Sequence, residues 1–498
     1  PFNYAGTCPF VYTLEASSGG PTVQNIPVYL TDDCALLGVD IATSFLRPCL
    51  PGSYSVNYLN FSNQTVAGTY VDVALDTFVS LISSSLPGVL QTGNTYRFQT
   101  GALAPGEAGQ FHINFTLDCD VPMGLTHCTE ANIYPAAVCP PDGAWSGAEL
   151  RVSGRCDGDS VRLEINNIGS NGMVSQLEYV VTEDLIMART MLYQLGFGGS
   201  TTIAFASNGS TWRIETPQEP GHPWGGVVAA AVEGCGGLNT PGMVNLFTMD
   251  DPDPFSAADC TQNTSAFDPN DKQGFPQGYD DERFIERNTD IEYMIRFQNT
   301  GTDTAFTVFI LDTLSQQLNI ASVRSGASSH NYDFDMLEGN VLRFRFDNIL
   351  LPDSNVNEVA SHGFVQFRVQ QQPDNPLGTV IPNRAAIYFD FNEPIITNTT
   401  WHTVGEQFIT VATNDPAAGF GPLRVYPNPA AETVFFEMPQ TQTGRLFELS
   451  DATGRKLQVR NFSEKVFRFK RGMLSAGIYF FRISAENGAT VSGKMVLK

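Results

Sequence analysis

Carboxylates gather in two neighbouring groups near the middle of the chain. Several hard oxygens close together on flexible loops are what a calcium ion prefers. The spacing is not that of an EF-hand loop, and the alternative is a solvated acidic linker held by Asx turns. The groups are therefore a candidate calcium site that would stiffen a joint, and no other cofactor is indicated. The six residues are Asp250, Asp251, Asp253, Asp268, Asn270 and Asp271.

Residues for nucleophilic, general-base or zinc catalysis do not fall into the patterns that such chemistry needs. No histidine has HExxH spacing, no serine lies in a GxSxG elbow, and the glycines at 234–237 lack the Lys-Ser/Thr end of a P-loop. We expect each histidine to be packed or exposed rather than a ligand or base, and we expect no enzyme. The histidines are His112, His127, His222, His330, His362 and His402.

Short strands must position these residues. Glycine (45 residues) and proline (30) separate runs rich in Phe, Val, Ile and Thr, and long helical periodicities are hard to find. Tyr54–Asn60 and Ile291–Asn299 alternate apolar and polar residues, as half-buried strands do. Asn-Ile-Gly at 167–169 and Asn-Thr-Gly at 299–301 then supply turn residues that tolerate positive φ. The predicted fold class is all-β, with tandem immunoglobulin-like β-sandwich domains and a jelly roll as the alternative geometry.

An internal repeat organises the acidic region. Tyr96–Phe98 and Phe111–Phe115 of one copy recur, in the same order, as Leu342–Phe344 and Phe364–Phe367 of another. Val161–Asn167 opens a third, more divergent unit. Units that repeat at this length, with short strands between turn signals, favour successive sandwiches.

The last part of the chain differs chemically from the rest. Residues 417–498 carry 12 Lys and Arg against 6 Asp and Glu, although the whole chain has a net charge of −24. Residues 1–416 contain a single lysine, Lys272. A change of charge sign and of lysine use marks a separate module. Its short alternating runs predict a small C-terminal β-sandwich.

This module resembles a known family. Tyr426–Pro429, the turn Asp451–Arg455, Leu474–Tyr479 and Gly493–Lys498 are similar to motifs of the C-terminal sorting domain of Bacteroidota type IX secretion cargo. The resemblance implies that the type IX secretion machinery is a partner. It also implies an extracellular or outer-membrane-surface location, with the domain cleaved or retained afterwards. The residues that would carry the sorting signal are Pro427, Asn428, Pro429, Gly454, Gly477, Tyr479, Lys494 and Lys498.

The preceding units resemble the DUF11/CARDB-like immunoglobulin-like repeats of large surface proteins. The stretch from Ser265–Lys272 to Arg384–Asn392 is especially similar to a module found ahead of the sorting domain in large Bacteroidota secreted proteins. This resemblance implies an architecture rather than an activity.

The nine cysteines all lie at or before Cys260. In an exported acidic chain they favour disulfides, and the lack of CxxC spacing argues against structural zinc. Spacing along the chain favours local pairs, although sequence does not fix the connectivity, and Cys8 is left over. The local pairs are Cys34–Cys49, Cys119–Cys128, Cys139–Cys156 and Cys235–Cys260.

Charge and hydropathy exclude two kinds of partner. A net charge of −24 argues against nucleic acid, because neutralising phosphates needs a basic surface. No apolar run approaches the ~20 residues of a membrane-spanning helix, so no transmembrane segment is expected.

The predicted domains are an immunoglobulin-like sandwich at 1–138, a divergent one at 139–262, a DUF11-like one at 263–404, a linker at 405–422 and the sorting domain at 423–498. We expect a non-enzymatic secreted or cell-surface protein with an adhesive or structural role towards an unidentified surface ligand. Two alternatives stay open. One is a self-associating subunit of an extracellular filament or sheath, and the other is the stalk of an enzyme located upstream of residue 1.

Overall fold

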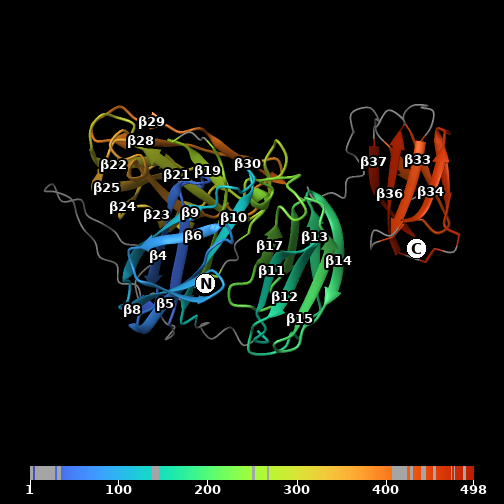
Figure 1. Ribbon diagram of the computed structural model, residues 1–498, viewed down its shortest axis with the longest axis horizontal. Coiled ribbons are helices and arrows are strands. Elements are labelled where there is room, and N and C mark those ends of the chain that lie inside the picture. The colour runs from blue at the N-terminus through green and yellow to red at the C-terminus, as the bar shows by residue number, and fades with distance from the viewer. Residues whose placement is uncertain are drawn as a thin grey trace. The chain divides into compact units, whose positions relative to one another are not determined.

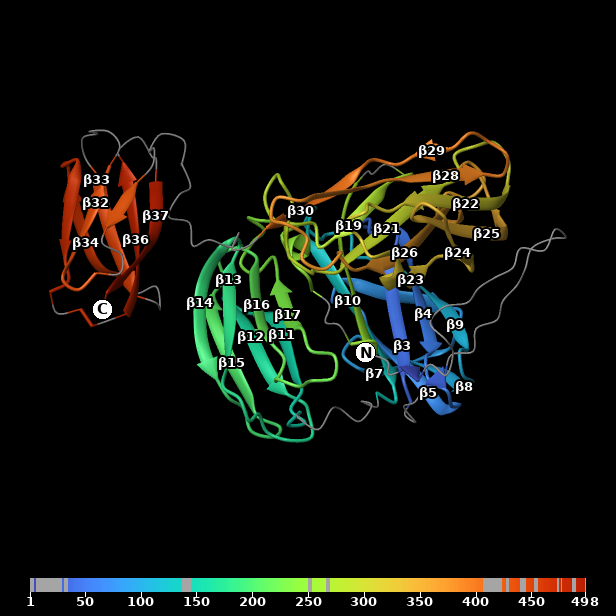
Figure 2. The ribbon, with the colours of Figure 1, turned by 180° about the vertical axis from the view of Figure 1, so that it is seen from behind.

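The described part of the chain is built from β-strands and short 3-10 helices. The structure is a computed structural model. Figures 1 and 2 show it from opposite sides. The 3-10 helices are η1 (Val244–Leu246), η2 (Ile320–Ser322) and η3 (Val359–Ser361), and the predicted all-β class is confirmed. The structure describes residues 4–5, 29–30, 35–136, 145–249, 253–265, 269–405, 423–426, 430–438, 445–451, 456–472, 474–475, 477–485 and 490–497.

The first sandwich packs two antiparallel sheets around one apolar core. One sheet has the strand order β3-β4-β9-β6 and the other has β18-β10-β5-β8-β7. Alternate residues of several strands, among them Tyr54, Val56 and Phe98, are fully buried between the sheets. A separate pair of short strands, β1 (Tyr4–Ala5) and β2 (Tyr29–Leu30), precedes this sandwich in the chain. The strands of the sandwich are β3 (Leu37–Thr43), β4 (Pro51–Asn60), β5 (Val66–Ala74), β6 (Val79–Ser84), β7 (Gly88–Thr92), β8 (Thr95–Leu103), β9 (Ala108–Leu117), β10 (Thr126–Tyr134) and β18 (Ser256–Gln262).

The strand β18 reaches the first sandwich from far along the chain. Residues 256–262 pair antiparallel with residues 126–132 of β10. The second sandwich is therefore inserted between two neighbouring strands of the first. The predicted unit 139–262 included β18, and this assignment is wrong because β18 lies in the first sandwich's sheet, with Phe255 and Ala257 buried in its core.

The second sandwich follows β10 and precedes β18. Its sheets have the orders β11-β12-β15 and β14-β13-β16-β17. Val161, Leu163 and Ile165 of β12 are fully buried, as the alternation of this run predicts. The strands are β11 (Leu150–Asp157), β12 (Ser160–Asn167), β13 (Leu177–Glu183), β14 (Ile186–Tyr193), β15 (Ser200–Ala206), β16 (Trp212–Pro217) and β17 (Val227–Val232).

The third sandwich has three sheets. Their orders are β19-β21-β26-β23, β24-β25-β22-β28-β29 and β20-β30-β27. Tyr293, Phe297, Phe344 and Phe367 fill its core. The strands are β19 (Lys272–Phe275), β20 (Phe284–Glu286), β21 (Ile291–Gln298), β22 (Ala305–Thr313), β23 (Arg324–Ser328), β24 (Asp333–Leu337), β25 (Val341–Leu351), β26 (His362–Val369), β27 (Val380–Asn383), β28 (Ala385–Phe389), β29 (Ile395–Ile396) and β30 (Thr400–Gly405).

The first and third sandwiches repeat one topology. The order β3-β4-β9-β6 corresponds to β19-β21-β26-β23, and β18-β10-β5-β8-β7 corresponds to β29-β28-β22-β25-β24. The landmarks that repeat in the sequence fall on corresponding strands, because β8 and β25 hold one pair and β9 and β26 hold the other. The sequence repeat therefore reflects a repeated strand arrangement.

In the first three sandwiches a buried asparagine at the end of β4, at the end of β12 and just after β21 holds the adjoining loops. Asn299 donates its side-chain N–H groups to the carbonyls of Asp303 (2.8 Å) and Leu351 (2.9 Å). Asn60 and Asn167 make matching pairs of bonds in their own sandwiches. The residues at 167–169 and 299–301 tolerate positive φ, but none of them adopts it. The side-chain amide fixes the turn instead.

The C-terminal module is a small sandwich by itself. Its sheets have the orders β31-β32-β35 and β34-β33-β36-β37. Phe436, Phe447, Phe467 and Phe481 pack in its core. The strands are β31 (Arg424–Tyr426), β32 (Thr433–Glu437), β33 (Arg445–Asp451), β34 (Lys456–Phe462), β35 (Val466–Lys470), β36 (Gly477–Ala485) and β37 (Thr490–Leu497).

Candidate functional site

The described acidic residues of the candidate calcium site accept hydrogen bonds from other groups of the protein. The Oδ1 atom of Asp253 accepts hydrogen bonds from the backbone N–H groups of Phe255 (2.6 Å) and Ser256 (2.9 Å), which is an Asx turn at the start of β18. Asp271 binds Arg296 through two bonds of 2.6 Å each. Carboxylate oxygens that already accept hydrogen bonds from the protein are less available to a metal ion.

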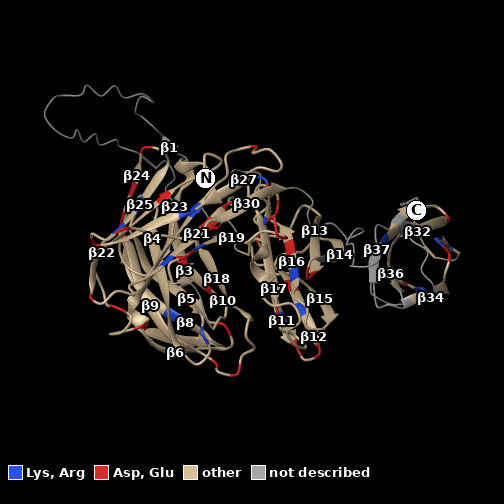
Figure 3. Ribbon diagram, turned by 90° about the horizontal axis from the view of Figure 1, so that it is seen from above, with Lys and Arg blue, Asp and Glu red and all other residues tan. Residues whose placement is uncertain are grey.

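The calcium assignment itself stays a prediction. Asn270 accepts from the backbone N–H of Gln298 (3.2 Å). Within the described ranges, no three His, Cys, Asp or Glu side chains converge in a way that could hold a metal ion. Asp250, Asp251 and Asp268 lie outside these ranges. Figure 3 shows many of the acidic positions on loops.

In the described part of the chain, three disulfides join segments that are distant in sequence. They are Cys49–Cys119, Cys128–Cys260 and Cys156–Cys235, with separations of 70, 132 and 79 residues. The use of disulfides is confirmed, but the predicted local pairing is wrong because at least one cysteine of every predicted pair has another partner. Strand order, rather than spacing along the chain, decides which cysteines meet. Cys8, Cys34 and Cys139 lie outside the described residues.

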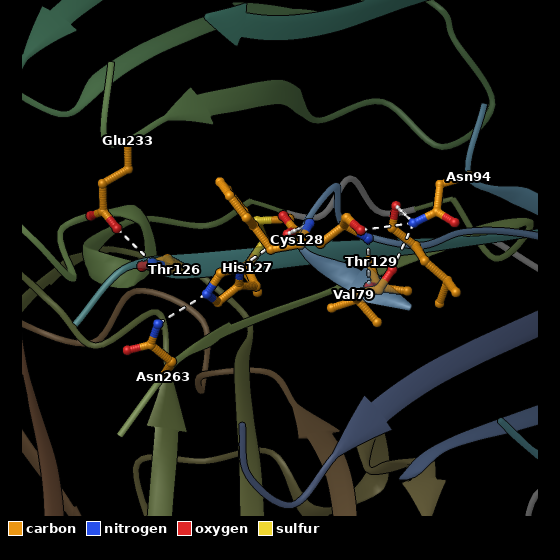
Figure 4. Close-up of polar contacts among 12 residues, drawn as sticks. Val79, Asn94, Thr126, His127, Cys128, Thr129, Glu233 and Asn263 are labelled. Carbon is orange, nitrogen blue, oxygen red and sulfur yellow. Dashed lines mark hydrogen bonds and ion pairs between the residues drawn. A yellow bond between two sulfur atoms is a disulfide. The ribbon is translucent and has the colours of Figure 1, made fainter. Parts of the chain in front are cut away.

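Polar side chains join the inserted second sandwich to β10 (Figure 4). Glu233 follows β17 and accepts the backbone N–H of Thr126 at 2.6 Å. Its other carboxylate oxygen accepts the N–H of Gly242 at 2.7 Å. Asn263, just after β18, lies 3.1 Å from Nε2 of His127, and it accepts the N–H of Gly124 at 2.6 Å. These bonds connect the segment after β17 and the residue after β18 to the start of β10 and the loop before it, near the Cys128–Cys260 disulfide.

The first and third sandwiches also contact each other. Ala42 packs with Met294, Ala327 and Phe364 in a small buried apolar cluster. Beside it, Arg296 donates to the carbonyl of Ser44 at 2.7 Å. Pairing with Asp271 and the bond to Ser44 offset part of the cost of burying the guanidinium. The contact therefore combines apolar packing with a directional bond.

The histidines take part in packing contacts, as expected. His402 is buried with Nε2 2.8 Å from the carbonyl of Pro276, and burial lowers its pKa to about 4. Burial, helped by His112, also lowers the pKa of His330 to about 4. His127 lies 3.0 Å from a carboxylate oxygen of Asp76. The contacts of His402 and His127 each join different segments of the chain.

Lys272 is buried in the core of the third sandwich. Its Nζ forms an ion pair with Asp312 of β22, and neither side chain has any exposed surface. The Nζ also lies 4.3 Å from the ring centroid of Tyr293 and 5.0 Å from that of Phe367. Lysines are almost never fully buried unless they are paired. Lys272 is the single lysine of residues 1–416, but this isolation in the sequence does not by itself indicate a role.

Asn383 completes this buried group. It ends β27, two residues before Ala385, which pairs with Asp312 in the sheet. Its side-chain amide lies close enough to the carboxyl of Asp312 and the phenol of Tyr293 to oppose the pKa shifts of both groups. Neither amide atom of Asn383, nor Oδ1 of Asp312, makes a well-formed hydrogen bond with the described residues. Neither Asp312 nor Asn383 has a sequence signal that sets it apart, so only the position of Lys272 could have led to them.

The electrostatics of the group favour neutral side chains. Burial lowers the pKa of Lys272, although the carboxylate of Asp312 opposes the shift. Burial raises the pKa of Asp312, against the opposing effects of Lys272 and then of the Asn383 amide. An uncharged amine and an uncharged carboxylic acid are the forms that such a dry site stabilises.

Three predicted sorting residues lie in the described part of the C-terminal sandwich. Gly477 opens β36, and Tyr479 is buried with its Oη donating to the carbonyl of Ser475 at 2.8 Å. Lys494 of β37 pairs with Phe480 of β36. Their role in export stays a prediction. Pro427, Asn428, Pro429, Gly454 and Lys498 lie outside the described residues.

Two parts of the chain match known families. Residues 424–498 match the secretion system C-terminal sorting domain, and residues 268–403 match a domain of unknown function (DUF7619). The chain therefore carries a type IX sorting tail, which indicates secretion to the cell surface or the extracellular space. Neither match is to DUF11 or CARDB-like repeats, so the resemblance to those repeats is not shown. No helix in the described ranges is long and apolar enough to cross a membrane.

Solved structures show only distant likeness. The collagen-binding subdomain of Enterococcus faecalis surface protein ACE is 11% identical with a TM-score of 0.20, over 28% of this chain and 99% of that chain. The major pilin subunit BcpA of Bacillus cereus is 11% identical with a TM-score of 0.21, over 70% and 95%. Collagen adhesin from S. aureus is 8% identical with a TM-score of 0.20, over 74% and 92%. With scores this low, the likeness says nothing about what this chain binds. No curated protein matches the sequence.

Proposed function

We propose that this is a non-enzymatic, load-bearing protein of the cell surface or extracellular space with an adhesive or structural role. The observation that supports this most is that two disulfides bridge long segments of the chain, so that a pulling force passes through the disulfides and not through the segments they close. Tension along the chain passes directly from Cys49 to Cys119 and from Cys128 to Cys260. The strands enclosed by these bonds cannot extend under load.

This route leaves the second sandwich outside the path of tension. Its strands lie entirely between Cys128 and Cys260. A module placed in this way keeps its fold while the chain is pulled, so it can present a surface to a ligand under load. The ligand is unidentified, and the type IX machinery is the partner for export.

Detachment of cells in shear flow tests this function. Cells that display the Cys128→Ser/Cys260→Ser protein should detach at a lower shear stress than wild-type cells, at equal amounts of surface protein. Cells with Cys156→Ser/Cys235→Ser are the matched control, because that bond lies within the second sandwich and outside the path. Equal detachment of all three strains would contradict the proposal.

A second candidate is a self-associating filament subunit. The edge strand β7 exposes Val89 (60%) and Leu90 (56%), and unprotected apolar edges pair with other chains. Negative-stain microscopy of purified protein should then show filaments, and Val89→Lys should abolish them. Single dispersed particles in the wild type would exclude this candidate. The role as a stalk for an upstream enzyme stays an untested alternative.

A further inference from the structure

The buried group of the third sandwich holds an amine, a carboxyl and a primary amide in one apolar core. Lys272 comes from β19, Asp312 from β22 and Asn383 from β27, so three different sheets supply the three groups. A purely structural ion pair would need only the first two. It would also gain little, since replacing a buried ion pair with apolar residues is often neutral or stabilising.

The amide is unexplained by packing alone. Asn383 is 3% exposed, and neither its Oδ1 nor its Nδ2 makes a well-formed hydrogen bond with the described residues, although the amide lies beside Asp312 and Tyr293. Leaving such a group buried and unpaired costs about 1–3 kcal/mol for each atom. Buried polar groups without partners call for a specific explanation, and a reaction at the amide supplies one.

We propose that Lys272 and Asn383 form an intramolecular isopeptide bond, with Asp312 as the catalytic proton carrier. The bond would join β19, the first strand of the third sandwich, to β27, close to its end. This activity goes beyond the proposed function, because the bond can form whatever the protein binds.

The chemistry balances without a co-reactant. The neutral Nζ of Lys272 attacks Cγ of Asn383, a C–N bond forms, and the carbonyl electron pair moves to Oδ1. The carboxyl of Asp312 donates a proton to Oδ1 and accepts one from Nζ. The carboxyl of Asp312 then donates its proton to Nδ2, the Cγ–Nδ2 bond breaks as the Cγ=Oδ1 double bond reforms, the proton on Oδ1 returns to Asp312, and ammonia leaves. An amine and a primary amide thus become a secondary amide and ammonia, with nothing oxidised or reduced.

Several features of the site favour this step. Lys272 packs against the rings of Tyr293 and Phe367, and burial in this core lowers its pKa, which favours the uncharged and nucleophilic form of the amine. Among the described residues, Asp312 is the one carboxyl that pairs with Lys272. If Asp312 were itself attacked by the amine, no second described carboxyl on Lys272 would carry the protons. The amide of Asn383 is therefore the preferred electrophile.

Mass spectrometry of the full, reduced chain tests the bond directly. The intact mass should be below the sequence mass by one ammonia. Trypsin should yield residues 214–283 linked to residues 369–384, with Lys272 uncleaved. Unlinked peptides at the sequence mass would overturn the proposal. A link to Asp312 with loss of water would equally overturn the assignment of Asn383.

Variants assign the roles. Lys272→Arg and Asn383→Ala should keep the full sequence mass, whereas the matched control Asn392→Ala, at an exposed site, should still lose one ammonia. In Asp312→Asn, the fraction that elutes with the wild type should be unlinked. A complete link in that fraction would remove Asp312 from the reaction. The wild-type peptide map decides the bond itself, even if a variant fails to fold.

Discussion

Removal of the Cys128–Cys260 disulfide tests whether β18 completes the first sandwich. The bond joins cysteines that are 132 residues apart. In the loop-entropy model, a cross-link over such a length stabilises the folded state by about 5 kcal/mol at 25 °C, and measured values are commonly smaller. In Cys128→Ser/Cys260→Ser, β18 keeps its backbone pairing with β10 and the buried Phe255. We therefore expect a loss of about 2–5 kcal/mol in local stability without loss of the sandwich.

Hydrogen exchange measured by mass spectrometry is the suitable assay, because a chain of several domains does not unfold in two states. Under oxidising conditions, peptides over 126–134 and 256–262 should lose protection together in the double variant. Cys156→Ser/Cys235→Ser should leave both peptides unchanged, since its disulfide lies within the second sandwich. A change below about 0.5 kcal/mol in the first variant would refute the reasoning, because surface substitutions alone reach that size.

Four further predictions follow from the same structure. Asn299→Ala should destabilise the third sandwich by about 2–4 kcal/mol, because the carbonyls of Asp303 and Leu351 lose their donor; hydrogen exchange over 299–303 measures this, and an unchanged rate would contradict it. Burial raises the pKa of Asp259 to about 7, so the folded state keeps a proton that the unfolded chain releases. Stability of the first sandwich should therefore fall as pH rises from about 4 to about 7, and Asp259→Asn should flatten this dependence in urea titrations; equal slopes would count against it. Deletion of residues 417–498 should retain the protein in the periplasm, which cell fractionation would show, and normal surface display would disprove the assignment. Calcium should raise the melting temperature of the full chain and EDTA reverse it if the candidate calcium site binds; no shift would reject that site.

Strand positions could be predicted from the sequence because a strand buried on one face alternates apolar and polar residues. Tyr54–Asn60 and Ile291–Asn299 are strands at corresponding places, as their shared pattern indicated. The sorting tail was predictable for a different reason, since its motifs and its charge are local in the chain. A family match at 424–498 supports it.

Long-range pairing could not be predicted, because alternation does not say which edge a strand joins. β18 looks like any other short strand, so its return to β10 and the pairing of Cys128 with Cys260 were both missed. The buried group of Lys272, Asp312 and Asn383 could not be predicted for the same reason. Lys272 stood out as the single lysine of the acidic region, but Asp312 and Asn383 meet it only when three sheets close around the core.

Single-molecule pulling of the full chain from its two ends tests the load-bearing account most directly. Under oxidising conditions, unfolding should release no length from the loops closed by Cys49–Cys119 and Cys128–Cys260, which span 70 and 132 residues. Adding a reductant should release that length, at about 3.3–3.6 Å per residue. Equal extension with and without reductant would contradict the account.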